Sequence, residues 1–314
     1  MQILTQPQTE HHLPFTALLP ALEQMFTTGC EVPLRHHHAI PGRSADEDGI
    51  LLLMPAWQTG QRLGVKTVSI FPGNARQGLP GLHSVYILYD ARTGQPLAVL
   101  DGDTITSRRT AAASALAARW LSRPDARRLL VVGSGRVARL LPTAYRCVRA
   151  LDTVEVWSRS PASAQALVDD LRAQGLPAQH APDLEAAVRR ADIVSCATLS
   201  TAPLIQGAWL QPGTHLDLIG SFTPAMRESD GECLRRATVF TDTTEALLKA
   251  GDLLGAIAEG AWSTDRLAAT LEQLCRQQHP GRRRADEITL FKSVGSALED
   301  LAAACLAYDG FSAG

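Results

Sequence analysis

The feature that most constrains the fold is an unbroken apolar run at residues 129–132 (LLVV), followed at once by Gly133-Ser134-Gly135. A run without polar alternation is typical of a parallel strand buried on both faces. Gly133, Gly135 and Ala138 have the G-x-G-x-x-G/A spacing of dinucleotide-binding turns, in which the second glycine lets the backbone approach a pyrophosphate. A helix that begins here would direct N–H groups and partial positive charge toward that anion. The alternative is a glycine turn in an α/β fold that binds no nucleotide.

Strands and helices alternate after residue 128. The pattern predicts strands at 153–157, 192–197, 215–219 and 237–241, with helices near 136–150, 161–174 and 183–190. Alternation at this spacing predicts an α/β fold with a Rossmann-type, doubly wound parallel sheet.

The first hundred residues have a different pattern. Short apolar runs at 49–55, 64–72 and 84–90 are separated by Gly and Pro turns, and residues 91–94 (ARTG) fit a hairpin turn. This region is predicted to be α+β with a largely antiparallel sheet. Residues 109–121, rich in alanine and leucine, predict a helix, and residues 297–307 predict a last helix that can pack back on the first domain.

The end of the second parallel strand bears on cofactor choice. NAD sites usually carry an acidic residue there, about 20 residues after the glycines, to hold the ribose 2′-hydroxyl. Here Ser158 occupies that position, and Glu155 lies two residues too early, inside the strand. Arg159, between Ser158 and Ser160, suits a 2′-phosphate because a guanidinium forms charge-assisted bonds with it. We therefore expect NADP(H), with NAD(H) as the weaker alternative.

Several cations precede the glycine turn. Lys66 lies inside an apolar strand, where its ammonium is expected to reach solvent or face a cleft. Arg108 and Arg109 are expected at the start of the helix, where the dipole disfavours cations, so a bound anion is predicted there. Arg43-Ser44 follows Pro-Gly in a turn. Each residue alone could be a surface charge; together they predict a carboxylate clamp.

Net charge, cysteine content and the lack of long apolar runs limit the class of protein. A net charge of −2 and a pI near 6.5 provide no basic field for nucleic acid or an anionic membrane, which favours small-molecule chemistry. The six scattered cysteines predict free thiols in a reducing compartment. The N-terminus lacks a signal-peptide pattern and no apolar run reaches about 20 residues, so a cytoplasmic location is expected. No metal site is expected, because His36, His37 and His38 on an extended chain alternate faces.

Several segments together resemble the ornithine cyclodeaminase/mu-crystallin family, over about residues 30–308. They are LLLMPAW (51–57), GVKTVSIFPGN (64–74), TGQPLAVLDGDTITSRRTAAASALAA (93–118), VVGSGRVA (131–138), residues 191–204, HLDLIGS (215–221) and LFKSVGSALED (290–300). The resemblance implies a homodimer whose subunit has a discontinuous substrate-binding and dimerisation domain, 1–120 with 293–314, and a Rossmann NADP-binding domain, 121–292.

The resemblance also implies site residues. Arg43 would hold the substrate carboxylate, with Lys66 or Arg109 contacting the substrate or standing beside the nicotinamide. Met54 and Phe222 would form apolar walls, and Lys66 or Ser44 would relay a proton. The expected cofactor-binding residues are Arg109, Thr110, Gly133, Ser134, Gly135, Arg136, Val137, Ser158, Arg159, Ser160, Thr198, Gly220 and Ser221.

Two departures bear on the reaction. Leu52 stands where cyclodeaminases carry an acidic residue, and Phe222 stands where they carry a catalytic aspartate. A phenyl ring transfers no proton, so ornithine deamination is not expected. The segment 220–230 (GSFTPAMRESD) looks more like bacterial Δ1-pyrroline-2-carboxylate reductases of this family. The expected reaction is NAD(P)H-dependent reduction of Δ1-pyrroline-2-carboxylate, with Δ1-piperideine-2-carboxylate as a second substrate, to L-proline or L-pipecolate.

Two alternatives remain open. One is an NAD(P)-dependent amino acid dehydrogenase of the alanine type, which shares hydride chemistry but releases ammonia from an open-chain imine. The other is a crystallin-like protein that binds NADPH and a small ligand without turnover. The sequence leaves ring-size preference, cofactor ratio and physiological direction undetermined.

Overall fold

The computed structural model describes residues 1–42 and 47–313. The chain divides into two compact units: unit 1 is Met1–Arg109 with Ser296–Gly314, and unit 2 is Thr110–Gly295. The division falls inside helix α3 (Gly102–Leu121), whereas the sequence placed a boundary after residue 120. Unit 1 is therefore discontinuous in sequence.

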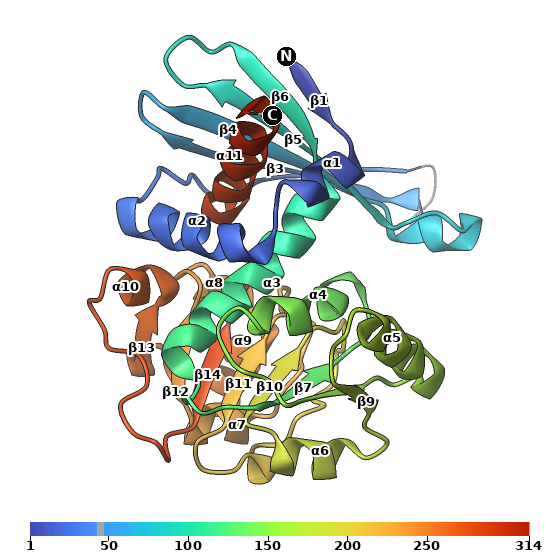
Figure 1. The fold of residues 1–314 in the computed structure, drawn as a ribbon, viewed down its shortest axis with the longest axis vertical. Coiled ribbons are helices and arrows are strands. Elements are labelled where there is room, and N and C mark those ends of the chain that lie inside the picture. Colours follow the sequence, from blue (N-terminus) through green and yellow to red (C-terminus); the bar gives the residue numbers. More distant parts are fainter. Residues whose placement is uncertain (43–46, 314) are drawn as a thin grey trace. The chain divides into compact units, whose positions relative to one another are not determined.

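Unit 1 contains a six-stranded sheet in the order β1-β6-β5-β4-β3-β2 (Figure 1). Neighbouring strands are antiparallel except for β1 and β6, which confirms the predicted α+β character. Its strands are β1 (Gln2–Leu4), β2 (His36–Ile40), β3 (Gly49–Gln58), β4 (Arg62–Ile70), β5 (Leu82–Asp90) and β6 (Pro96–Asp101); its helices are α1 (Gln6–His11), α2 (Phe15–Thr28), the 3-10 helix η2 (Pro72–Gln77) and α11 (Ala297–Ala313).

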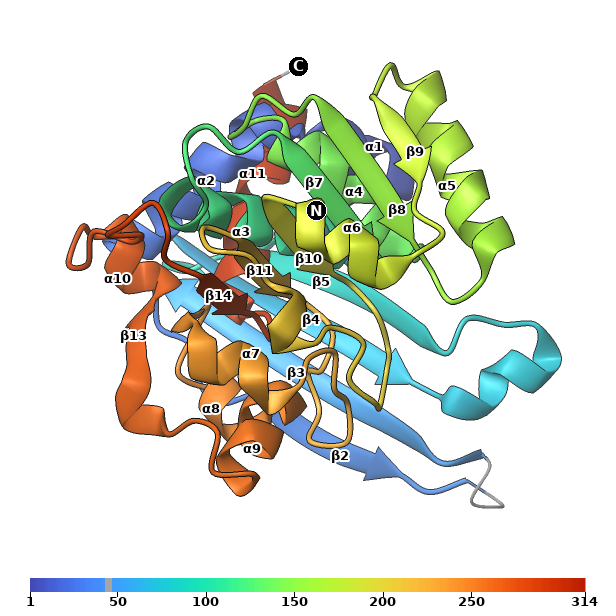
Figure 2. The ribbon, with the colours of Figure 1, turned by 90° about the horizontal axis from the view of Figure 1, so that it is seen from below.

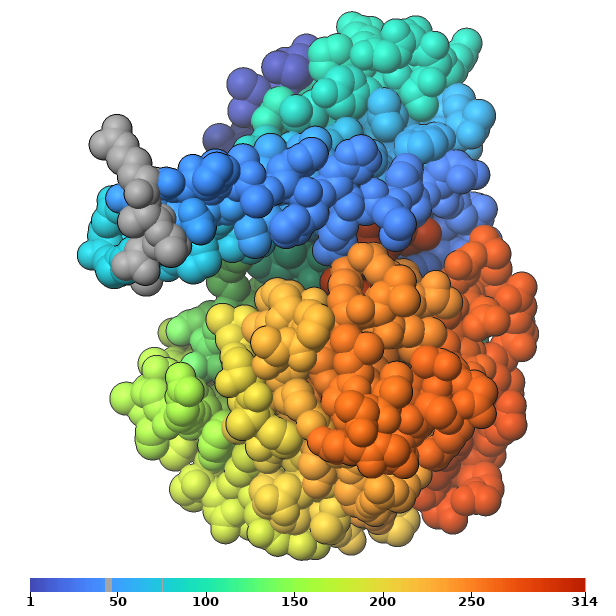
Figure 3. Space-filling model, turned by 180° about the vertical axis from the view of Figure 1, so that it is seen from behind, coloured from blue at the N-terminus to red at the C-terminus, as the bar shows by residue number. Residues whose placement is uncertain are grey.

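Helices cover one face of this sheet. Helix α11 packs on α2, β3, β4 and β5, as the sequence predicted for the last helix. In Figure 1 both helices lie in front of the sheet, and the view from behind in Figure 3 shows strand residues, coloured light blue to teal, on the other side. On that side the strand pairing aligns Pro55, Val65, Ile87, Val99 and Ile3 in one apolar row.

Helix α3 begins seven residues before the predicted start at residue 109, at Gly102. The Asp101 carboxylate accepts the backbone N–H of Thr104 at 2.7 Å, which caps the helix. Glycine is needed at 102 because a Cβ there would lie 2.7 Å from the backbone carbon of Ser84. Arg109 thus lies about two turns inside the helix, and the argument from its first-turn dipole was wrong.

Arg108 has a structural role. Its guanidinium donates to the Leu13 carbonyl at 2.8 Å, pairs with Glu10 at 3.1 Å and stacks over the Phe15 ring, 4.5 Å from its centroid. It therefore joins α3 to the connection between α1 and α2.

Unit 2 contains an eight-stranded parallel sheet in the order β13-β12-β14-β11-β10-β7-β8-β9. Figure 2 shows β7, β8, β10 and β11 with the flanking helices. This is the predicted Rossmann-type sheet, since the chain moves outward from β7 through β8 and β9 on one side and through β10 and β11 on the other. Its strands are β7 (Arg128–Val132), β8 (Thr153–Trp157), β9 (Ala178–His180), β10 (Ile193–Cys196), β11 (His215–Leu218), β12 (Thr238–Thr241), β13 (Leu267–Thr270) and β14 (Thr289–Lys292).

Helices flank this sheet. They are α4 (Arg136–Tyr145), α5 (Pro161–Ala173), α6 (Leu184–Arg190), α7 (Gly231–Arg236), α8 (Ala246–Lys249), α9 (Gly251–Ala258) and α10 (Leu271–Cys275), with the 3-10 helices η3 (Gly207–Trp209) and η4 (Thr264–Arg266). Helix α4 ends earlier than the predicted residue 150, while α5 and α6 match their predicted ranges to within a residue.

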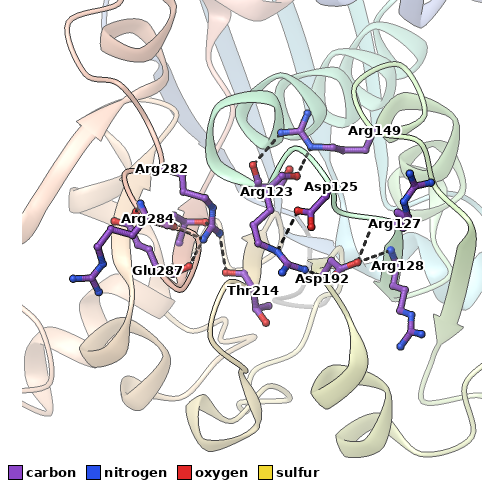
Figure 4. A network of polar contacts seen from close by, with 12 residues as sticks. Arg123, Asp125, Arg127, Arg128, Arg149, Asp192, Thr214, Arg282, Arg284 and Glu287 are labelled. Carbon is purple, nitrogen blue, oxygen red and sulfur yellow. Dashed lines mark hydrogen bonds and ion pairs between the residues drawn. The ribbon is translucent and has the colours of Figure 1, made fainter.

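Two arginines donate hydrogen bonds to the backbone carbonyl oxygens at the C-terminal end of α3. Arg149 donates to the carbonyls of Ala118 at 3.0 Å and Arg119 at 2.9 Å. Arg282 bonds the carbonyls of Trp120 through its backbone N–H and Leu121 through its side chain. Figure 4 shows further contacts of the same two guanidinium groups, from Arg149 to the Arg123 carbonyl and from Arg282 to the Thr214 carbonyl. The last four carbonyls of a helix lack intrahelical partners, and these side-chain and backbone donors supply the missing hydrogen bonds.

Within the described residues, no helix has both the length and the apolar content that a membrane span requires.

Candidate active site

The glycine turn follows β7 and contains two glycines with different requirements. Gly133 has φ +121°, and a Cβ there would lie 2.5 Å from the Ala197 carbonyl oxygen, so backbone shape and close packing both demand glycine. Gly135 has φ −77°, which any residue adopts, and an added Cβ would meet no atom within 4 Å. Among the described residues, therefore, neither backbone shape nor packing requires a glycine at 135, and the space beside its Cα is open.

Helix α4 begins directly after Gly135, without a side-chain cap from the described residues. The turn stands at the carboxyl end of β7, whose neighbours β8 and β10 extend the sheet in opposite directions. That position is the topological switch point, where ligands of doubly wound sheets bind. Ser134, Arg136 and Val137 occupy the turn and the first helical positions, as predicted.

Ser158, Arg159 and Ser160 lie at the end of β8. The Ser134 and Ser158 hydroxyl oxygens are 3.2 Å apart, which joins the glycine turn to this strand end. Ser160 caps α5 by accepting the backbone N–H of Ser163 at 3.3 Å. The Arg159 side chain is exposed, and no polar partner for it is found among the described residues.

Glu155 is buried and its carboxylate is already engaged. It accepts two hydrogen bonds from Arg190, at 2.8 and 2.6 Å, and one from Gln179 at 3.2 Å. Glu155 is the acidic residue nearest the carboxyl end of β8, and these contacts hold its carboxylate away from that end, as its position in the sequence indicated.

Glu228 organises the loops after β10 and β11. Its Oε1 accepts the backbone N–H of Thr198 at 2.7 Å and the Thr198 hydroxyl at 2.8 Å. A Cβ on Gly220 would lie 2.5 Å from the Glu228 carboxyl group, so glycine is needed there. Burial raises the pKa of Glu228 to about 8; Lys292 opposes this rise and Asp252 adds to it.

Ser221 is held in the same neighbourhood. It has φ +53°, donates from its hydroxyl to the Met226 carbonyl at 2.6 Å, and accepts the Asp252 backbone N–H at 2.8 Å. Asp252 in turn accepts the backbone N–H groups of Glu228 and Ser229. Thr198, Gly220 and Ser221, all predicted as cofactor-binding, are thus brought together by two buried carboxylates.

Lys292 is fully buried at the end of β14. Its ammonium donates to the carbonyls of Leu218 and Ser293, both at 2.9 Å, and of Gly220. It therefore fixes the backbone that leads out of β11.

Unit 1 contains a buried cluster of four charges. Lys66 Nζ lies 2.7 Å from Asp300 Oδ2 and 3.2 Å from the Thr106 hydroxyl. Arg109 donates from Nε to Asp300 Oδ1 at 2.8 Å and from a terminal nitrogen to Glu299 at 2.8 Å. The two predicted catalytic cations are therefore joined by one carboxylate. Lys66 is 2% exposed, so the expectation that its ammonium reaches bulk solvent was wrong.

Burial and the neighbouring charges together set the pKa of Lys66. Burial lowers the pKa of Lys66 to about 8; Asp300 opposes this shift, and Arg109 and Arg35 add to it. Burial alone would raise the pKa of Asp300, but Lys66 and Arg109 bring it below its usual value. Lys66 can therefore exchange a proton near neutral pH, which an arginine could not do.

The surroundings of Lys66 are partly apolar. Strand pairing places Met54 and Tyr86 on either side of it, and all three side chains are buried. The Tyr86 hydroxyl has no hydrogen-bond partner among the described residues. Phe222, expected as a second apolar wall, is 44% exposed, in unit 2. Arg43 and Ser44 lie outside the described residues.

Sequence reasoning missed the anionic partners Asp300, Glu299, Glu228 and Asp252. One signal pointed to the lysines: the chain has three, Lys66, Lys249 and Lys292, among 30 lysines and arginines. Two of the three are buried. In a chain whose cations are nearly all arginines, a buried lysine indicates a site that takes a compact ammonium with three donors better than a planar guanidinium.

The fold and the glycine turn define a Rossmann-type α/β protein. A model of the ornithine cyclodeaminase/mu-crystallin family matches residues 1–314, and the chain belongs to that family.

Individual relatives cover most of the chain. It is 41% identical over 278 residues to a Δ1-pyrroline-2-carboxylate reductase of Paracoccus denitrificans, covering 85% of this chain and 87% of that one. A Thermococcus litoralis Δ1-pyrroline-2-carboxylate reductase, solved with NADH and L-proline, is 31% identical with a TM-score of 0.92, covering 98% and 97% of the two chains. An archaeal alanine dehydrogenase dimer with bound NAD is 30% identical with a TM-score of 0.90, covering 100% and 96%.

Proposed function

We propose that this protein reduces a cyclic imino acid, Δ1-pyrroline-2-carboxylate, to L-proline at the expense of NAD(P)H, with Δ1-piperideine-2-carboxylate as a second substrate. The observation that carries the proposal is the buried Lys66, whose ammonium lies 2.7 Å from the Asp300 carboxylate and whose pKa is lowered by burial to about 8. The similarity to two proteins named Δ1-pyrroline-2-carboxylate reductase supports the same substrate class.

Unit 2 fits a dinucleotide. The open space at Gly135 is what a pyrophosphate would need to approach the α4 N-terminus. Thr110, Thr198, Gly220 and Ser221 would complete the binding residues. When bound, the reduced nicotinamide supplies the hydride that the imine carbon requires. We further propose a preference for NADPH, because Ser158 stands where an NAD site usually has an acid and the exposed guanidinium of Arg159 lies directly beside it.

Unit 1 would bind the substrate. Within the described residues the Lys66 ammonium contacts two polar partners, Asp300 and Thr106. An ammonium has three N–H donors, and we propose that one of them binds the substrate. Lys66, with Arg109 and Arg43, would pair with the substrate carboxylate, and Met54 would contact the apolar ring carbons. Lys66 or Ser44 would supply the proton to the ring nitrogen.

We propose that the protein is a homodimer. The apolar row from Pro55 to Ile3 is left uncovered by α2 and α11, and a second copy of this chain would cover it. A similar fold is described as a dimer in the archaeal alanine dehydrogenase.

The test is turnover by the purified protein. With NADPH and Δ1-pyrroline-2-carboxylate we expect loss of absorbance at the reduced-nicotinamide band and formation of L-proline. Pyruvate with ammonia tests the alanine-dehydrogenase alternative, to which the 30% identity gives weight, and L-ornithine tests cyclodeamination. Binding of NADPH without turnover of any substrate would favour the crystallin-like alternative. Release of ammonia from L-ornithine would contradict our expectation that Phe222, in place of the catalytic aspartate, prevents deamination.

A further inference from the structure

We propose that Asp300 is a positioning residue that divides its carboxylate between Lys66 and Arg109 and keeps Lys66 charged in its buried site. Its role in turnover rests on the proposed function, but its effect on Lys66 is measurable without substrate.

The geometry assigns one oxygen to each cation. Asp300 Oδ2 lies 2.7 Å from Lys66 Nζ, and Oδ1 accepts from Arg109 Nε at 2.8 Å. Asp300 lies in the first turn of α11, where the helix dipole stabilises a carboxylate. It thus fixes the separation of two cations that arise from β4 and α3.

The partners are not equivalent. Among the described residues, Asp300 is the acidic partner of Lys66, whereas Arg109 also pairs with Glu299 at 2.8 Å. Neutralising Asp300 would leave Arg109 with an anion and Lys66 with none. The Thr106 hydroxyl is the remaining polar partner of Lys66, and it carries no charge.

The other charged and titratable groups near Lys66 oppose its protonation or contribute little to it. Arg109 on α3 and Arg35 before β2 both lower the pKa of Lys66. Tyr86 on β5 is buried with its pKa raised well above the usual value, so it stays neutral. The charge on Lys66 therefore depends on Asp300.

The experiment is a titration of Lys66 by NMR in protein that carries [ε-13C]lysine. With three lysines in the chain, the spectrum is simple, and Lys249 and Lys292 serve as internal references. We compare wild type, Asp300→Asn and the matched control Glu299→Gln. We expect Asp300→Asn to lower the pKa of Lys66 by at least one unit and Glu299→Gln to change it by much less.

Activity supplies a second readout. The basic limb of the pH profile of kcat/KM should move to lower pH in Asp300→Asn by the same amount as the Lys66 titration, and stay near its wild-type position in Glu299→Gln. If wild type reduces no imino acid, the proposed function fails while the NMR titration still tests Asp300. An unchanged Lys66 titration in Asp300→Asn, or equal shifts in both variants, would overturn the proposal.

Folding supplies a third measurement in case Asp300→Asn is too unstable to titrate. The Asp300→Asn substitution is then compared in the wild-type and Lys66→Met backgrounds. A smaller loss of melting temperature in the Lys66→Met background supports the coupling, because no uncompensated ammonium remains to be buried. Equal losses in both backgrounds would show that Asp300 acts independently of Lys66.

Discussion

At the scale of single residues, the two glycines of the turn make separable predictions. Gly133→Ala should lower stability by about 1–3 kcal/mol, because φ +121° and the contact with the Ala197 carbonyl oppose a Cβ. Gly135→Ala should leave the melting temperature close to wild type but weaken dinucleotide binding at least tenfold, because its Cβ enters the space that the pyrophosphate needs. Thermal unfolding and calorimetric binding of NADPH measure the two effects, and unchanged binding in Gly135→Ala would remove Gly135 from the site.

Arg159 decides the cofactor prediction. Arg159→Ala should weaken NADPH binding by about 1.5–3 kcal/mol, the contribution of a charge-assisted bond, and leave NADH binding nearly unchanged. Arg127→Ala is the matched control, since Arg127 is an exposed arginine near the opposite end of β7, paired with Asp152 at 3.3 Å. Equal losses for the two cofactors would show that Arg159 does not recognise the 2′-phosphate.

The sequence identified cations more readily than their partners. Lys66 and Arg109 stand out because each breaks an apolar or alanine-rich pattern. Asp300 and Glu299 do not, because acidic residues in the first turn of a helix are ordinary. Their pairing joins positions 66, 109 and 300, which only the folded chain brings together.

At the scale of elements, alternation of strands and helices predicted β7, β8, β10, β11 and β12 and the helices α4, α5 and α6 of unit 2, but not β9, β13, β14 or the short helices α7 to α10. The start of α3 was predicted too late. The segment Asp101-Gly102-Asp103 reads locally as a turn, but the Asp101 cap and the close approach of Ser84 make it the first turn of the helix. The close approach is a tertiary effect, so local propensity could not indicate it.

The other end of α3 gives an element-scale prediction. Arg149→Met should lower stability by about 2–4 kcal/mol, because it removes charged donors from the carbonyls of Ala118 and Arg119. Arg146→Met, an exposed arginine of the same segment, is the control and should change stability little. Chemical denaturation monitored by circular dichroism gives the free energy of unfolding of both variants. Similar losses in the two would mean that water can replace Arg149 as the donor to these carbonyl oxygens.

At the scale of the whole molecule, we predict that a charge on the uncovered sheet face of unit 1 prevents dimerisation. Ile87 lies between Val65 and Val99 in the apolar row, and Ile87→Lys would place an ammonium in the proposed interface. Light scattering should give a mass near twice 33.7 kDa for wild type and near 33.7 kDa for the variant. Leu248→Lys, at a 73% exposed position in unit 2, should stay dimeric. A wild-type monomer would contradict the proposed dimer, and a dimeric Ile87→Lys variant would place the interface elsewhere.

The buried acids make the stability of the folded chain depend on pH. Glu228 has a folded pKa of about 8 against an ordinary value of 4.5, so the folded state binds more protons than the unfolded state between these values. Stability should therefore fall as pH rises through this window, by up to about 1.4 kcal/mol per pH unit from this group. Burial also raises the pKa of Asp217, to about 6, which acts in the same direction, whereas the pKa of His215, lowered to about 3 by burial, acts oppositely below pH 6.5.

Glu228→Gln isolates the first of these groups. The amide oxygen can still accept from Thr198, but the variant has no proton to lose, so its melting temperature relative to wild type should increase steadily between pH 5 and 8. The contributions of Asp217 and His215 are common to both proteins and cancel in that difference. Glu185→Gln, which removes an exposed carboxylate paired with Arg189, should show a difference that stays flat with pH. A flat difference for Glu228→Gln as well would mean that Glu228 ionises normally and that the loops after β10 and β11 are held by a charged carboxylate.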